Sequence, residues 1–165
     1  MLRLLLVYCS FFFCVTALSA EGADRLEELG WIENVRIFPG EIELGAKLDT
    51  GADHCSLHAS DIDYFQQGKD RYVRFTIRNR KGEEITLERK VHRYASIRRV
   101  EGGKHHRPVV QLFLCLGSKL MKVDVNLADR SQLAYPMLIG RSFLAGNITV
   151  DSSKTYSKDP RCSLP

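Results

Sequence analysis

Apolar and polar residues alternate along much of this chain, in short runs that turn residues separate. Residues 31–37 and 72–78 follow the two-residue period of a half-buried strand. Residues 109–116 form a nearly continuous apolar run, as in a strand that is buried on both faces. Other strand-like runs are residues 42–48, 85–87, 120–127 and 137–140. The pattern predicts a mainly β domain of about nine short strands, arranged as a small barrel or a sandwich.

Helix is expected at only two places. Residues 141–145 are long enough for one or two helical turns after the last apolar run. The charged segment 21–30 is expected to be a linker or a short helix that Gly30 ends. Residues 152–165 are polar and are expected to form a loosely held tail. These limits leave residues 31–151 as the folded domain.

The first 20 residues have the layout of a secretory signal peptide. Arg3 precedes an apolar run from Leu4 to Val15, and small residues lead to Ala20. The alternative is an uncleaved anchor, but a bilayer-spanning helix needs about 20 apolar residues and this run is shorter. We therefore expect a secreted or periplasmic protein that has no membrane association once the leader is removed.

Charge and cysteine content narrow the functional classes. Without its leader the chain has 23 basic and 20 acidic residues, and this small excess gives no indication of nucleic-acid binding. Three cysteines remain, Cys55, Cys115 and Cys162, an odd number for an oxidising compartment. One disulfide with one free thiol, or a bridge between subunits, would both fit. The wide spacing matches no zinc motif.

A candidate catalytic residue ends the apolar run 42–48, in the sequence Asp49-Thr50-Gly51. An isolated carboxylate is a poor acid and a weak base at neutral pH. Two carboxylates about 3 Å apart share one proton, so one can deprotonate a water while the other protonates a substrate carbonyl oxygen. Gly51 lets backbone N–H groups approach the carboxylates, and the Thr50 hydroxyl can fix the geometry. However, the chain contains only one Asp-Thr-Gly, and such a tripeptide can be an ordinary turn.

Two motifs together resemble the retropepsins, the retroviral-type aspartic proteases. The first is Asp49-Thr50-Gly51-Ala52-Asp53, and the second, Leu138-Ile139-Gly140-Arg141, follows about ninety residues later. In that family the Gly-Arg element supports the Asp-Thr-Gly loop, and an identical subunit supplies the second aspartate. The resemblance implies a small closed acid-protease barrel with one short helix. It also implies a homodimer that hydrolyses an extended peptide with Asp49 of both chains.

The same resemblance gives roles to further residues. Ala52 and Asp53 would contact the substrate, and Asp53 would pair with Arg141 near the dimer seam, two exposed charges being the alternative. A flap that contains Gly102 and Gly103 would close over the peptide. Leu138 and Ile139 would support the catalytic loop from behind.

The closer match is to a bacterial subgroup of retropepsin-like proteins often labelled ATP-dependent zinc proteases. It is carried by Leu57-His58-Ala59, by Arg107-Pro108-Val109-Val110 and by several residues between 129 and 151. This chain differs from the subgroup at Asp53, where a basic residue is usual. Its segment 60–100 is also longer than that of a minimal retropepsin, which leaves the register of the flap open.

The residues do not support the metal or the nucleotide of that label. His54, Cys55 and His58 could offer ligands, as could His105-His106, but neighbouring side chains of a strand point to opposite faces. No Gly-rich Lys-Ser/Thr loop occurs. We therefore expect no metal and no cofactor, with Cys55 acting as a small buried hydrophobe.

Two rival functions remain at this stage. The same fold could bind peptides without cleaving them, or a zinc hydrolase could use His54 and His58. A basic cluster within residues 89–107 could bind an anionic polymer or an acidic peptide, or could be a solvated sheet edge.

Overall fold

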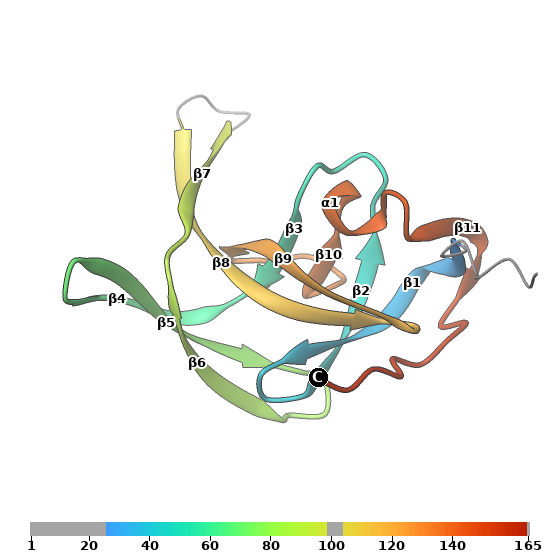
Figure 1. Cartoon of the computed structure of the whole chain (residues 1–165), viewed down its shortest axis with the longest axis horizontal. Helices are drawn as coiled ribbons and strands as arrows, with labels where there is room; N and C mark the ends of the chain where they lie inside the picture. The colour runs from blue at the N-terminus through green and yellow to red at the C-terminus, as the bar shows by residue number, and fades with distance from the viewer. Residues whose placement is uncertain (1–25, 99–103, 165) are drawn as a thin grey trace, which may run out of the picture.

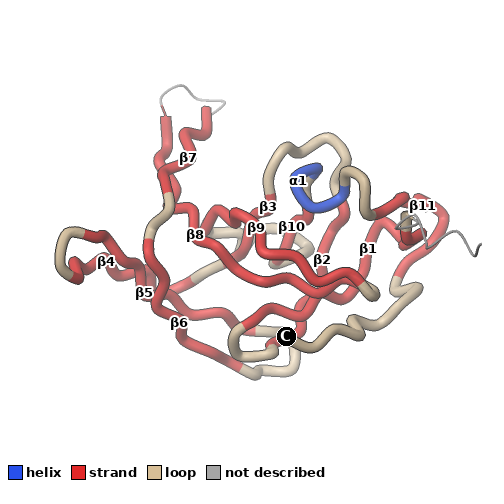
Figure 2. The backbone as a smooth tube through the Cα atoms, in the orientation of Figure 1, coloured by secondary structure: helices blue, strands red, loops and turns tan. Residues whose placement is uncertain are grey.

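The computed structural model describes residues 26–98 and 104–164, which form eleven strands and one short helix (Figure 1). The strands are β1 (Glu27–Phe38), β2 (Ile42–Leu48), β3 (Cys55–His58), β4 (Ser60–Gln67), β5 (Asp70–Arg78), β6 (Glu84–Lys90), β7 (Arg93–Arg98), β8 (Lys104–Leu116), β9 (Lys119–Ala128), β10 (Met137–Ile139) and β11 (Ile148–Thr155). The helix is α1 (Arg141–Leu144). Figure 2 shows how completely strands dominate the chain, which confirms the predicted class.

Six of the strands close into a barrel. Neighbouring strands pair in the order β1, β2, β10, β3, β9 and β8, and β8 then pairs with β1 to complete the circle. Strand β11 extends the sheet outside β1, and β7 extends it outside β8. The strands β4, β5 and β6 form a separate three-stranded sheet. The closed acid-protease barrel with one short helix is therefore confirmed, with two more strands than the sequence pattern indicated.

Buried side chains alternate with less buried ones along the barrel strand β2, and the buried set faces the core. In β2, Ile42, Leu44, Ala46 and Leu48 are all buried, because every second residue of a strand faces the same side. The second sheet contributes Val73, Phe75 and Ile77 of β5 to the same buried cluster. The three-stranded sheet, which occupies much of the long segment 60–100, thus shares the core of the barrel.

The expected N-terminal helix is wrong for its described part. Glu27 to Gly30 belong to β1 and pair in parallel with Ile148 to Asp151 of β11. The charged pattern indicated a helix, but a strand partner some 120 residues away overrides local propensity. The signal-peptide segment lies outside the described residues.

The C-terminal segment is not loosely held. Residues 152–155 continue β11, and the Tyr156 N–H donates to the Ile32 carbonyl over 2.7 Å. The fully buried Glu33 carboxylate of β1 accepts N–H donors from Gly30 at 2.6 Å and Ser157 at 3.0 Å. The tail therefore supplies hydrogen bonds to a buried polar side chain, which would be costly to leave without partners.

One disulfide fixes the end of this segment. Cys115 of β8 is bonded to Cys162, while Cys55 is a free, buried thiol. This confirms the alternative of one pair with one free cysteine.

In the described part of the chain, no helix is long and apolar enough to cross a membrane.

Candidate active site

The Asp-Thr-Gly loop joins the ends of two strands that are not direct neighbours. Strand β10 lies between β2 and β3, parallel to the first and antiparallel to the second. Leu48 is paired with Ile139, and the Asp49 N–H donates to the Ile139 carbonyl over 2.8 Å. The barrel's own ladder of hydrogen bonds therefore fixes the backbone of Asp49.

The loop then folds back on the Asp49 side chain. The Gly51 N–H donates to Asp49 Oδ1 over 3.0 Å, and the Ala52 N–H donates to the Asp49 carbonyl over 3.2 Å. The other carboxylate oxygen, Oδ2, lies 3.4 Å from Lys47 Nζ. The Asp49 side chain is 27% exposed in the single chain, so one oxygen is held by the loop while the carboxylate stays reachable. Thr50 and Gly51 are exposed beside it.

Gly140 lets the chain pass directly beside this loop. A Cβ atom at this buried position would come within 2.6 Å of the His54 carbonyl oxygen and 2.9 Å of the Ala52 carbonyl oxygen. The Arg141 N–H donates to the Ala52 carbonyl over 2.8 Å, and the Ser142 N–H donates to the Asp53 carbonyl over 3.0 Å. Backbone hydrogen bonds thus join the start of α1 to the loop, at an approach so close that only glycine fits at position 140.

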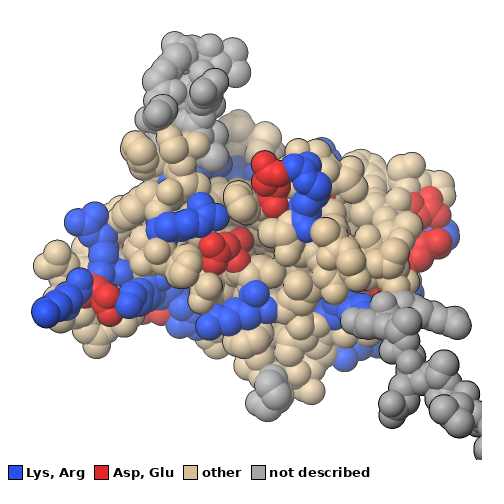
Figure 3. Space-filling model, turned by 45° about the horizontal axis from the view of Figure 1, so that its top comes forward, with Lys and Arg blue, Asp and Glu red and all other residues tan. Residues whose placement is uncertain are grey.

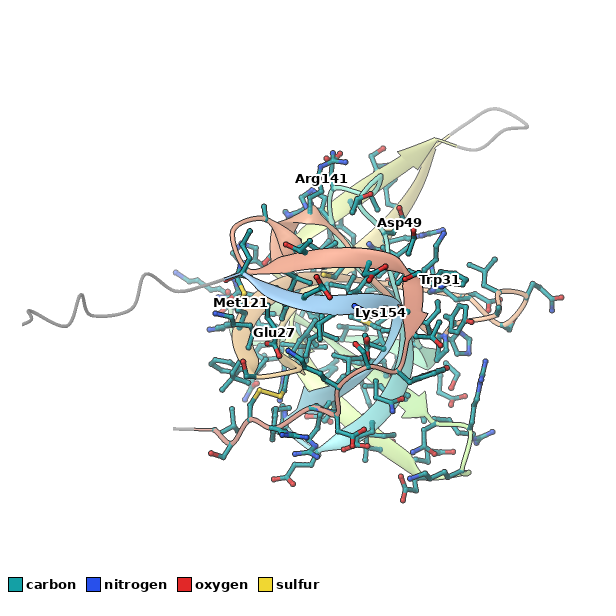
Figure 4. The ribbon with its side chains drawn as sticks, turned by 90° about the vertical axis from the view of Figure 1, so that its right-hand side faces the viewer. Glu27, Trp31, Asp49, Met121, Arg141 and Lys154 are labelled. Atoms are coloured by element: carbon teal, nitrogen blue, oxygen red, sulfur yellow. A yellow bond between two sulfur atoms is a disulfide. The ribbon has the colours of Figure 1, made fainter. Side chains whose placement is uncertain are left out.

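The Arg141 side chain completes the connection. Its Nη1 donates to the Thr50 carbonyl over 2.9 Å, and its Nη2 contacts the Asp53 carboxylate. Figure 4 shows Arg141 and Asp49 at the same end of the molecule. The predicted Asp53–Arg141 pair is therefore confirmed. Because the two side chains are 72% and 48% exposed in the single chain, the pair contributes under about 1 kcal/mol to stability there and chiefly orients the loop.

A cleft of about 300 Å³ opens beside the loop. Ala52 and Asp53 line it from the loop, together with Leu138 of β10, and Arg93 and Arg107 line it from the hairpin of β7 and β8. The two glycines expected in the flap, 102 and 103, lie outside the described residues. Strands β7 and β8 line the cleft with Arg93, Ala95, Arg107 and Val109, and the flap itself stays a prediction.

Three arginines give this cleft a basic character that sequence reasoning found only in part. Arg93 and Arg107 belong to the basic cluster, whereas Arg130 stands in the sequence match to the bacterial subgroup but was given no role in the site. Burial lowers the pKa of Arg130, with repulsion from Arg107 adding to the effect and Asp49 opposing it. Among the described residues, Arg107 Nε is the buried side-chain nitrogen without a hydrogen-bond partner. Away from the cleft, the left-hand part of the surface in Figure 3, where Figure 1 places β4, β5 and β6, also shows more basic than acidic side chains.

The candidate zinc ligands do not converge. His58 Nδ1 accepts the Arg130 N–H over 2.9 Å and lies 3.7 Å from Asp129 Oδ1, so this side chain contacts the loop after β9. Cys55 is buried and burial raises the pKa of its thiol, whereas the adjacent His54 is exposed. Among the side chains that the structure describes, no three His, Cys, Asp or Glu form a metal-binding group, and the candidate ligand His105 lies outside them.

Comparison with known proteins agrees with this geometry. The family model described as "Retropepsin-like aspartic endopeptidase RimB" matches residues 28–161. A protein of Parasynechococcus marenigrum named "Probable alpha-L-glutamate ligase" is 31% identical over 67% of this chain. A protein of the same name from Shewanella pealeana is 29% identical over 72% of it. The chain spans about a quarter of the length of these relatives, 24% and 27%.

A solved structure is similar over most of the chain. Lpg0085 from Legionella pneumophila, a protein described as having unknown function, superposes with a TM-score of 0.68. It is 32% identical, and the match covers 79% of this chain and 97% of that one. The match thus covers nearly the whole of the Legionella chain, but only about a quarter of the proteins named as ligases.

Proposed function

Since the chain belongs to the RimB-like family of retropepsin-like aspartic endopeptidases, we propose that it hydrolyses peptide bonds with a pair of Asp49 carboxylates contributed by two identical chains. The observation that carries the proposal is the Asp49 loop. Its backbone is fixed by β10, one carboxylate oxygen is held by the Gly51 N–H, and the side chain remains reachable. A two-fold axis through this exposed loop would bring the second carboxylate into reach.

The chemistry then needs no metal. With one proton shared between the two carboxylates, the ionised Asp49 takes a proton from a water, whose oxygen attacks the peptide carbonyl carbon. The protonated Asp49 of the other chain gives its proton to the carbonyl oxygen, which forms a gem-diol. Return of a diol proton to a carboxylate and protonation of the amide nitrogen break the C–N bond. The two carboxylates thereby regain their starting protonation.

We propose that the peptide is acidic. Arg93, Arg107 and Arg130 line the cleft next to the catalytic loop, and guanidinium groups bind carboxylates with paired hydrogen bonds. Asp124 neutralises one of them, because Arg93 Nε lies 3.2 Å from Asp124 Oδ2. Two relatives are named for a ligase that acts on α-L-glutamate, and this name supports a substrate that contains glutamate.

Export to an oxidising compartment is the location we propose. The disulfide between Cys115 and Cys162 supports it, since such bonds persist outside the reducing cytosol. The apolar N-terminal leader read from the sequence agrees with this assignment.

The test uses two peptide sets of equal length, one rich in glutamate and one with glutamine in its place. The parent should cut the glutamate set faster, and Asp49→Asn should lower the cleavage rate of both sets by about a thousandfold or more. Asp63→Asn, which alters an exposed carboxylate on β4, is the matched control and should cut like the parent. Arg107→Gln should remove the preference for glutamate while cleavage continues.

The outcomes separate the rivals. Equal cleavage by Asp49→Asn and the parent would exclude Asp49 as the catalyst. Binding of the glutamate peptides by both proteins, without fragments at any pH from acid to neutral, would favour the peptide-binding module.

A further inference from the structure

A second cavity, of about 410 Å³, opens at the other end of β2 from the catalytic loop. Pro39, in the turn between β1 and β2, contributes to its wall, and the seven residues of β2 separate that turn from Asp49. At about 3.3 Å per residue the separation is roughly 23 Å. No described residue lines both this cavity, here called the Phe38 groove, and the catalytic cleft. Figure 1 shows the C-terminal segment running to this turn.

The floor of the Phe38 groove is aromatic. Phe38 of β1 is paired with Phe113 of β8, and Phe113 is paired in turn with Lys122 of β9. Residues paired directly across strands share one face of the sheet, so the two rings and the lysine form a row. Leu164, which is 43% exposed, adds an apolar wall from the C-terminal segment.

The rim of the groove is basic. Arg89, Lys90, His92 and Lys122 line it, and no carboxylate is among its described lining residues. Lys90 has a partner, because its Nζ lies 2.8 Å from Asp70 Oδ2. Arg89 donates only to the neighbouring Glu88 carbonyl over 2.7 Å, and Lys122 forms no ion pair with any described residue. Among the described residues, these two cations therefore border an apolar cavity without a counter-ion.

We propose that the Phe38 groove binds a small amphipathic carboxylate, with its apolar body on Phe38 and Phe113 and its anionic group between Arg89 and Lys122. The volume falls in the usual range for small-molecule sites, which join an apolar lining to a few placed polar groups. An extended peptide fits less well. At Phe113 the strand β8 is already paired with β1 on one side and β9 on the other, so no free strand edge is available to it.

Octanoate is the probe for the test, and calorimetric titration of the purified protein with its disulfide intact is the measurement. Octanoate should bind one site per chain at least about tenfold more tightly than octylamine or acetate. Octylamine lacks the anionic group, and acetate lacks the apolar body. Lys122→Glu should weaken octanoate binding by about tenfold or more. Lys69→Glu, an equal charge change in the exposed turn between β4 and β5, should leave it unchanged.

A second variant separates loss of the site from loss of the fold. Phe113→Gln should reduce octanoate binding, and far-UV circular dichroism together with the unfolding midpoint shows whether its barrel is intact. Lys122→Gln changes an exposed position, so this variant should fold like the parent and bind octanoate less tightly. Equal affinity for octanoate and octylamine, or no octanoate binding, would overturn the proposal. So would Lys122-dependent sedimentation with anionic phospholipid vesicles in the absence of octanoate binding, which would assign the groove to a membrane surface. None of these readouts depends on peptidase activity.

Discussion

Gly140 is the residue at which the supporting strand and the catalytic loop meet most closely. Replacement by alanine would place a Cβ within 2.6 Å of the His54 carbonyl oxygen, and backbone cannot move aside as a flexible side chain could. We expect Gly140→Ala to lower the free energy of unfolding by about 1–3 kcal/mol, the usual cost of overpacking. Chemical denaturation followed by fluorescence would measure it. Peptidase activity should fall as well, because the displaced atoms belong to the Asp49 loop.

Gly45→Ala is the matched control, since Gly45 also lies in the barrel wall. There the nearest atom to an added Cβ is the Tyr156 hydroxyl oxygen at 3.6 Å, an ordinary contact. An alanine within a strand loses less backbone entropy on folding than a glycine, so the free energy of unfolding should stay the same or rise by up to about 1 kcal/mol. Equal effects of the two substitutions would contradict the steric explanation.

The residues of the candidate site could be located from sequence where each lies in a short motif. Asp49, Gly51 and Arg141 are marked by their immediate neighbours, and the strand pattern places the first of them at the end of β2. Arg130 belongs to the sequence match with the bacterial subgroup, but no local pattern places it in the cleft. It follows β9, whose parallel pairing with β3 joins residues far apart in the sequence.

The elements at the two ends of the chain were the hardest to predict. The first residues of β1 pair in parallel with β11, whose residues lie far away in the sequence, so no local pattern predicts this part of the strand or its register. The tail is held by Glu33 and by a disulfide, and the cysteine spacing alone left two pairings open. In the middle of the chain, β2 and β5 were predictable because burial of one face leaves a period of two in the sequence, and β8 because it is a nearly continuous apolar run. The strands β3, β4 and β7 were not among the predicted runs.

The disulfide should therefore be the main support of the C-terminal element. It closes a loop with a sequence separation of 47 residues. The chain-entropy estimate for a loop of this length gives about 4 kcal/mol, and removal of native disulfides typically costs about 2–5 kcal/mol. We expect Cys162→Ser to lower the free energy of unfolding by about 2–4 kcal/mol, measured by urea denaturation without reductant.

Reductant provides the control for this loss. Dithiothreitol should destabilise the parent to a similar extent and should leave Cys162→Ser unchanged. Cys55→Ala, which removes the buried free thiol, should retain the sensitivity to reductant. A Cys162→Ser protein as stable as the oxidised parent would show that β11 and the Glu33 contacts alone hold the segment.

At the scale of the whole molecule, the decisive question is whether one chain suffices. Each chain brings a single Asp-Thr-Gly, and its Asp49 loop is exposed rather than covered by the barrel. If activity needs Asp49 from two chains, a dimer that contains one Asp49→Asn subunit should be nearly inactive. After subunit exchange in an equal mixture at constant total concentration, only parent pairs would cleave, so activity should fall to about one quarter of that of the parent.

Independent active chains would instead leave about half of the activity, because the variant would only dilute the parent. A mixture with Lys69→Gln, changed at an exposed turn, should keep full activity and controls for the mixing procedure. Sedimentation of the same samples should show dimers wherever activity is full. One chain has no second Asp-Thr-Gly loop, so the shared dyad requires two chains. Retention of half the activity in the mixture, or full activity in a sample that sediments as monomer, would therefore refute the shared dyad.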